Sequence, residues 1–215
     1  MHSKKIIIFT GPSLHPDEAS KILDADYRPP IKRGDVTTAL NENPDIIGII
    51  DGVFHQTPAV SHREILDALK KGVIVVGGAS MGALRASELD DFGMVGIGYV
   101  YKQYKEGFIE SDDDVAIVMD PITLKQISDS LVSMEYSFKT ALNNGLISKS
   151  EFKKLIHTAK SIFYPKRNYN LVLSNVDIDP QKVAELKEFL DEHGIDIKRN
   201  DAIDVVKYIK SLNSL

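Results

Sequence analysis

The chain has 215 residues, of which 43% are hydrophobic and 27% charged, with a formal net charge of −5. This balance is typical of a globular protein and argues against a dedicated binder of nucleic acid or anionic membranes, although basic clusters at 166–167 and 198–199 can serve local contacts. The absence of cysteine excludes disulfides, thiolate metal sites and iron–sulfur clusters within this sequence.

The chain opens on a continuous apolar run, residues 4–10, which predicts a strand buried on both faces. The run is too short for a signal peptide or a membrane span, so we expect a cytoplasmic protein with no membrane partner. It ends in a turn with Gly11 and Ser13, before a helix that Pro16 begins. Such a turn can hold an anion, so Gly11 and Ser13 are candidate substrate-binding residues. The turn lacks GxGxxG and the lysine of a P-loop, so no nucleotide cofactor is expected.

The next elements continue the alternation of strand and helix. Prolines 29 and 30 forbid a central strand beyond Tyr27, and a small helix is expected over residues 35–40. Residues 46–50 and 73–76 are apolar runs joined by a helix over 61–71, and a right-handed crossover makes their strands parallel. The sequence therefore predicts an α/β fold, with a Rossmann-like parallel sheet and helices on both faces.

The pattern changes after residue 90. Glycines alternate with apolar residues over 93–100, which predicts a loop with a short strand and a helix. Another strand is expected over 115–118, and from Pro121 apolar residues recur every three or four positions, as in a helix. Further helices are expected over 149–164, 180–193 and 201–212. The predicted organisation is an α/β core over residues 1–120 and an all-helical C-terminal region over residues 121–215.

A GxSxG pattern, residues 78–82, lies where the strand over 73–76 becomes a helix. A serine between small residues at such a turn is typical of a nucleophile elbow, which lifts the hydroxyl above the sheet. Ser80 is therefore a candidate nucleophile, and the Met81 N–H is a candidate oxyanion donor. Gly78 and Gly82 have no side chain that could cover the hydroxyl. The alternative is a helix start with Ser80 as N-cap and glycines that only allow close packing.

Asp51 and Gly52 follow the strand over 46–50, at the edge where parallel sheets bind ligands. His62 begins the next helix at that edge, so it is expected near Asp51 and within reach of Ser80. A helix N-terminus favours a neutral imidazole, which is the form that a general base requires. The alternative is a structural histidine bonded to a backbone carbonyl.

Other polar residues near this edge allow further interpretations. Ser61 and Glu64 have the spacing of a capping box, which accounts for both. Arg85 can hold a substrate carboxylate or pair with Glu88 or Asp90, and Glu88 itself is expected to be solvated. Zinc ligation by Asp51, His55 and His62 is an alternative, but their spacing matches no metal motif, so no metal is expected.

Motifs in a fixed order along residues 5–120 carry a family resemblance: DGVF at 51–54, GASMGALRASEL at 78–89, FGM at 92–94 and DVA at 114–116. Together they resemble the TfuA-like family. The resemblance implies partnership with YcaO proteins, ATP-dependent enzymes that replace a peptide backbone oxygen by sulfur. It further implies sulfide delivery by hydrolysis of a thiocarboxylated sulfur-carrier protein. The alternative is a non-catalytic adaptor that recruits the carrier and activates the YcaO enzyme.

Hydrolysis of a thiocarboxylate is acyl transfer to water, which needs a nucleophile or activated water, a base and oxyanion donors. Ser80, His62 and Asp51 are the catalytic candidates. Their chain order differs from that of α/β-hydrolases, which excludes that fold but not the chemistry. Direct attack by water, with Ser80 only holding the carboxylate, is equally open. The candidate substrate-binding residues are Gly11, Ser13, Gly52, Gly78, Met81, Gly82 and Arg85.

Overall fold

The computed structural model describes residues 4–53, 57–109, 111–120 and 122–213. The chain forms two compact units, Met1–Asp112 with Lys198–Leu215, and Asp113–Ile197. Within the described residues, no helix is both long and apolar enough to cross a membrane.

The first unit contains a parallel sheet of five strands in the order β2-β1-β3-β4-β5. The predicted α/β fold is therefore confirmed. The short strand β2 lies at one edge, where the prolines that follow it break no central pairing. The strands are β1 (Ile6–Phe9), β2 (Asp26–Arg28), β3 (Ile46–Ile49), β4 (Ile74–Gly78) and β5 (Val95–Ile97).

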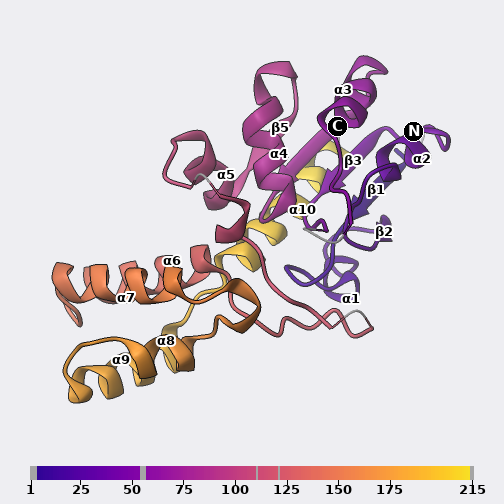
Figure 1. The fold of residues 1–215 in the computed structure, drawn as a ribbon. Coiled ribbons are helices and arrows are strands. Elements are labelled where there is room, and N and C mark those ends of the chain that lie inside the picture. Colours follow the sequence, from indigo (N-terminus) through magenta and orange to yellow (C-terminus); the bar gives the residue numbers. More distant parts are fainter. Residues whose placement is uncertain (1–3, 54–56, 110, 121, 214–215) are drawn as a thin grey trace. The chain divides into compact units, whose positions relative to one another are not determined.

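Helices cover both faces of this sheet (Figure 1). Side chains alternate along each strand, so Ile7 and Ile47 face α2, α3 and α4, whereas Ile8 and Ile46 face α1 and α10. The chain runs from β1 to one edge and from β3 to the other, so right-handed crossovers put α1 on the face opposite to α2, α3 and α4. The helices are α1 (Pro16–Ala19), α2 (Asp35–Leu40), α3 (His62–Lys70), α4 (Met81–Leu89), α5 (Gly98–Lys105) and α10 (Ile197–Asn213).

The last helix, α10, packs on the sheet of the first unit. Ala202, Val205, Val206 and Ile209 are buried against side chains of β1 and β3. The helix begins at Ile197 rather than at the predicted residue 201. It runs antiparallel to the strands, because Val205 lies beside Gly78 near the carboxyl edge and Ile209 beside Gly48.

The second unit is helical and packs around Phe138 and Leu155, which are fully buried. Its α7 ends at Ser161, before the predicted residue 164, and α8 was not predicted. Buried Arg167 links this unit internally, because its guanidinium donates to the Asp113 carboxylate at 2.7 Å and to the Ala159 carbonyl at 3.0 Å. The helices are α6 (Leu131–Asn143), α7 (Lys149–Ser161), α8 (Tyr169–Asn175) and α9 (Pro180–His193).

Two predictions for residues 115–130 are wrong. Residues 115–118 form no strand, and the helix expected from Pro121 begins only at Leu131; Pro121 itself lies outside the described residues. The Asp120 carboxylate accepts the N–H groups of Ile122 and Thr123, at 2.9 and 2.7 Å, and so stabilises a turn. A tight turn of this kind competes with helix formation, and the period of the apolar residues does not reveal it.

Candidate functional site

The carboxyl ends of β1 and β3 lie side by side at the point where the strand order reverses. In doubly wound sheets a crevice opens at this point, because the connections that leave the two strands go to opposite faces. Here one connection is the turn over residues 11–13, which leads to α1, and the other begins at Asp51 and leads to α3. The topology therefore brings this turn and Asp51 together.

Asp51 holds the turn that follows β1. Its Oδ2 accepts the backbone N–H groups of Gly11 and Ser13, both at 2.9 Å, and its Oδ1 accepts the Ser13 hydroxyl at 2.6 Å. Burial raises the pKa of Asp51, while Lys198 and the hydrogen bonds from Ser13 and Gly11 lower it. All three predicted residues thus lie in direct contact, and their part in catalysis or substrate binding stays a prediction.

A second buried charge reaches this edge from the C-terminal helix. Lys198, in the first turn of α10, is 1% exposed and interacts electrostatically with Asp51. One turn further along α10, the Asp201 carboxylate accepts the N–H groups of Tyr99 and Val100 at 2.8 and 2.7 Å. This contact caps the start of α5. Sequence analysis missed Lys198, because only the folded chain brings α10 to this edge of the sheet.

Ser80 lies between β4 and α4, as the GxSxG pattern predicts. Ala79, just before it, has a φ of +66°, a left-handed conformation that is uncommon for residues with a Cβ and marks a sharp turn. Ser80 occupies the N-cap position, yet its side chain makes no cap hydrogen bond. Within the described part of the chain its hydroxyl has no hydrogen-bond partner. The N-cap alternative therefore explains where Ser80 lies but gives its hydroxyl no function.

The first turn of α4 packs directly on the end of β3. The Gly82 N–H donates to the Ile50 carbonyl at 3.2 Å, whereas the Met81 N–H makes no hydrogen bond to any residue that the structure describes. A free N–H at a helix start carries a positive partial charge. The Ser80 hydroxyl and the Met81 N–H are therefore two neighbouring hydrogen-bonding groups that the fold itself leaves unused.

Three candidate substrate-binding glycines pack against the chain itself. A Cβ on Gly82 would lie 1.7 Å from the Ile49 carbonyl oxygen, and one on Gly78 would lie 2.5 Å from Val205. A Cβ on Gly52 would lie 2.6 Å from the Met81 side chain. These contacts show that each position needs glycine for close packing. Contact between these glycines and a substrate stays a prediction.

His62 is the first residue of α3, and its Nε2 lies 2.8 Å from Oε2 of Glu88 on α4. Among the described residues no hydrogen bond joins it to Asp51 or Ser80. When the neutral ring donates from Nε2 to Glu88, its Nδ1 is the acceptor. His62 thus has a carboxylate partner that the sequence did not indicate, whereas the predicted capping box of Ser61 and Glu64 is confirmed.

Arg85 fixes the carboxylate that His62 contacts. Its Nη1 donates to the same Glu88 oxygen at 2.6 Å, and its Nε donates to the Val60 carbonyl at 3.0 Å. Of the two interpretations of Arg85, the structure shows the pairing with Glu88. Glu88 is exposed, as expected, and its carboxylate also contacts His62 on α3 and Arg85 on α4.

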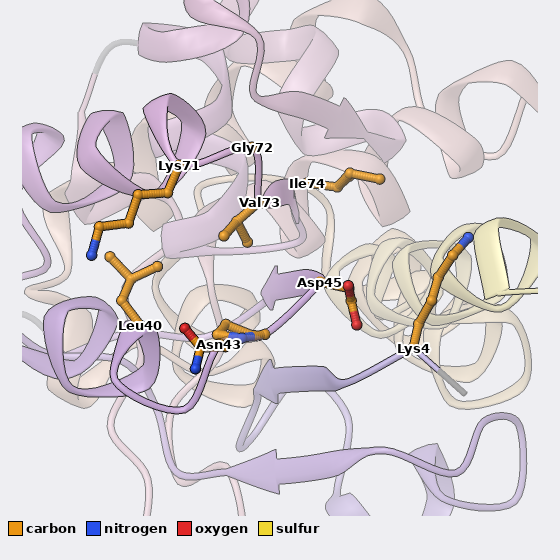
Figure 2. Close-up of a pocket in the computed structure, with 9 residues that line it drawn as sticks. Lys4, Leu40, Asn43, Asp45, Lys71, Gly72, Val73 and Ile74 are labelled. Atoms are coloured by element: carbon orange, nitrogen blue, oxygen red, sulfur yellow. The ribbon is translucent and has the colours of Figure 1, made fainter. Parts of the chain in front are cut away.

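Other parts of the first unit hold fewer candidate catalytic or metal-binding groups. A cavity of about 380 Å³ lies at the amino-terminal edge of the sheet, lined by Lys4, Asp45 and Lys71 among others (Figure 2). Its described lining contains no serine, threonine or histidine, so it lacks the serine and histidine that the predicted acyl transfer uses. No cluster of three potential metal ligands occurs among the described residues. His55, part of the zinc alternative, lies outside them.

Comparison with known proteins agrees with the motifs at this edge. The sequence profile of a family described as TfuA-like protein matches residues 51–168, which include Asp51, His62 and Ser80. No curated protein matches the chain.

Proposed function

The chain belongs to the TfuA-like protein family, and we propose that it serves ATP-dependent, YcaO-catalysed thioamidation of a peptide backbone in the cytoplasm. Its task is to release sulfide from the C-terminal thiocarboxylate of a sulfur-carrier protein. One observation carries the proposal. The Ser80 hydroxyl stands at a sharp strand-to-helix turn, beside the Met81 N–H, and the described residues give neither group a hydrogen bond.

The overall reaction is RCOS⁻ + H₂O → RCOO⁻ + H₂S. In the serine route the Ser80 oxygen attacks the thiocarboxylate carbon, the C–S bond breaks, and the serine proton leaves with the sulfur. Water then hydrolyses the seryl ester and restores the hydroxyl. The Met81 N–H receives the oxyanion, and His62 is the proposed base, which must leave its contact with Glu88 to act there. In the water route Ser80 and Met81 hold the carbonyl oxygen, while His62, again released from Glu88, activates water.

The test is sulfide release from a purified thiocarboxylated carrier protein by this chain alone. We expect release by the wild type, and loss of at least about a hundredfold in rate for Ser80→Ala, the range of a lost catalytic group. Ser87→Ala, on the same helix, is the matched control and should keep the wild-type rate. A wild type that releases no sulfide, or a folded Ser80→Ala with full activity, refutes the hydrolase proposal.

A second function, a non-catalytic adaptor, is favoured by one observation. His62 pairs with Glu88 and not with Ser80, and half of the His62 side chain is exposed, so this cluster is also suited to contact a protein partner. An adaptor binds the carrier and the YcaO enzyme and speeds thioamide formation even when free sulfide is supplied. A hydrolase is dispensable at high sulfide. Thioamide formation measured at low and high sulfide, with and without this protein, separates the two.

A further inference from the structure

The turn between β4 and α4 bends the backbone over a single residue. The Ser80 N–H donates to the Gly78 carbonyl at 2.8 Å, and Ala79 between them has a φ of +66°. A hydrogen bond across one residue with a positive φ is typical of the rare and strained form of the γ-turn. Ala79 therefore holds a backbone conformation that costs free energy, and the surrounding structure must maintain it.

Glycine would adopt this conformation without strain, because it has no Cβ. The chain has glycine at the preceding position, Gly78, yet alanine at the strained one. Ala79 is fully buried and belongs to the apolar cluster that contains Leu14, before α1, and Val205 of α10. Its methyl group thus packs on the face of the sheet that α1 and α10 cover, and this packing holds Ala79 in its strained conformation.

The backbone on both sides of the Ser80 side chain is occupied by hydrogen bonds. Its N–H is bonded to Gly78, and its carbonyl accepts the N–H groups of Ala83 and Leu84 at 3.0 and 3.2 Å. The Ser80 carbonyl and the Met81 N–H belong to one planar peptide unit, so a fixed carbonyl also fixes the direction of that N–H. The γ-turn and the first turn of α4 together therefore fix the Ser80 Cβ and the Met81 N–H relative to each other.

We propose that Ala79 is a positioning residue of this site: its buried methyl group locks the γ-turn and so holds the Ser80 side chain and the Met81 N–H in place for one substrate carbonyl group. Without the methyl group the backbone at this position has the freedom of glycine. A misplacement of about 1 Å can cost about a hundredfold in rate. The effect on turnover rests on the proposed function, whereas the effect on the turn does not.

The first experiment measures the order of the turn by the ¹H–¹⁵N heteronuclear NOE of the Ser80 and Met81 amides. In Ala79→Gly both values should fall below those of the wild type, because the turn gains motion on the picosecond to nanosecond timescale. Ala39→Gly, at a fully buried alanine of α2, is the control and should leave both values unchanged. Unchanged values in Ala79→Gly overturn the proposal.

Urea denaturation separates positioning from packing. The midpoint of Ala79→Gly should stay close to that of the wild type, because the relieved strain offsets the loss of the methyl group. Ala39→Gly should lower the midpoint, since it places glycine in a helix and also removes a buried methyl group. If Ala79→Gly does not fold, or loses more stability than Ala39→Gly, the methyl group serves mainly to stabilise the fold and the proposal is overturned.

Turnover gives a further readout. If the wild type releases sulfide, Ala79→Gly should lower kcat by about tenfold or more and leave KM unchanged, whereas Ala39→Gly should keep the wild-type kcat. An unchanged kcat in Ala79→Gly overturns the proposal. If the wild type releases no sulfide, the proposed hydrolase function fails, and the order of the Ser80 and Met81 amides still decides the role of Ala79.

Discussion

The Nε2 atom of His62 lies 2.8 Å from Oε2 of Glu88, which joins the first residue of α3 to the last turn of α4. Ser80 lies at the other end of α4, about two turns or ~12 Å away along the helix axis. A base acts within hydrogen-bond reach or through one water, so His62 can serve attack at Ser80 only after its side chain leaves Glu88.

Substitution of His62 tests whether it is the base in sulfide release. His62→Gln keeps a hydrogen-bonding side chain that cannot accept a proton, and should lower kcat by ~10²-fold. Glu88→Ala removes the carboxylate that holds the ring in the last turn of α4, so it should not lower kcat.

Asp91→Asn, an exposed carboxylate beyond the end of α4, is the control for charge alone. If His62→Gln keeps the wild-type rate, His62 is not the base. The exposed cluster then belongs to partner binding, as in the adaptor alternative.

Ser80→Ala should leave the free energy of unfolding nearly unchanged, within about 0.5 kcal/mol, because the hydroxyl makes no cap hydrogen bond. Ser148 is the matched comparison, since it caps α7 in a complete capping box with Glu151. Ser148→Ala should cost about 1 kcal/mol. Urea denaturation of both variants measures the difference. An equal or larger loss for Ser80→Ala would show that its hydroxyl has a structural role after all.

Local pattern was enough to predict the three inner strands of the sheet and the turns that follow β1 and β4. Continuous apolar runs indicated β1, β3 and β4, and small residues around Ser80 indicated the strand-to-helix turn. Each of these signals is contained in a short stretch of sequence. The contact between the turn over residues 11–13 and Asp51 follows from parallel topology alone.

The other site contacts join elements far apart in the chain. Lys198 lies at this edge only because α10 packs on the sheet, and the spacing of the apolar residues in α10 does not reveal which surface the helix covers. Glu88 carries no local sign that it pairs with His62, since an isolated charge on a helix is usually solvated. The turn at Asp120 was missed because its side-chain bonds to the backbone leave the apolar period unaltered.

Gly82→Ala tests how closely α4 approaches β3. By helix propensity alone, alanine would stabilise this position by about 1 kcal/mol. The new Cβ would lie 1.7 Å from the Ile49 carbonyl oxygen, a backbone atom at the end of the central strand that cannot move aside. We expect a loss of more than about 3 kcal/mol, at the upper end of overpacking costs. Thermal unfolding gives the sign, and a stabilised variant would contradict the close packing.

Asp201 should make the stability of the first unit depend on pH. Burial raises the pKa of this carboxyl group to about 6, against hydrogen bonds from Val100 and Tyr99 that lower it. The folded state then binds a proton that the unfolded state has released, over the range from about pH 4 to about pH 6. The contribution of Asp201 to stability is therefore greatest below about pH 4 and is lost as the pH rises through about 6.

The difference across this range is at most about 3 kcal/mol, since each pKa unit corresponds to ~1.4 kcal/mol. Asp201→Asn keeps an oxygen for the two N–H groups but cannot titrate, so its unfolding free energy should fall less than that of the wild type between pH 4 and pH 7. Asp67→Asn, an exposed carboxylate on α3, is the control and should keep the wild-type slope. Urea denaturation across this range measures all three proteins. Equal slopes for the wild type and Asp201→Asn would show that the buried carboxyl group does not take up the proton.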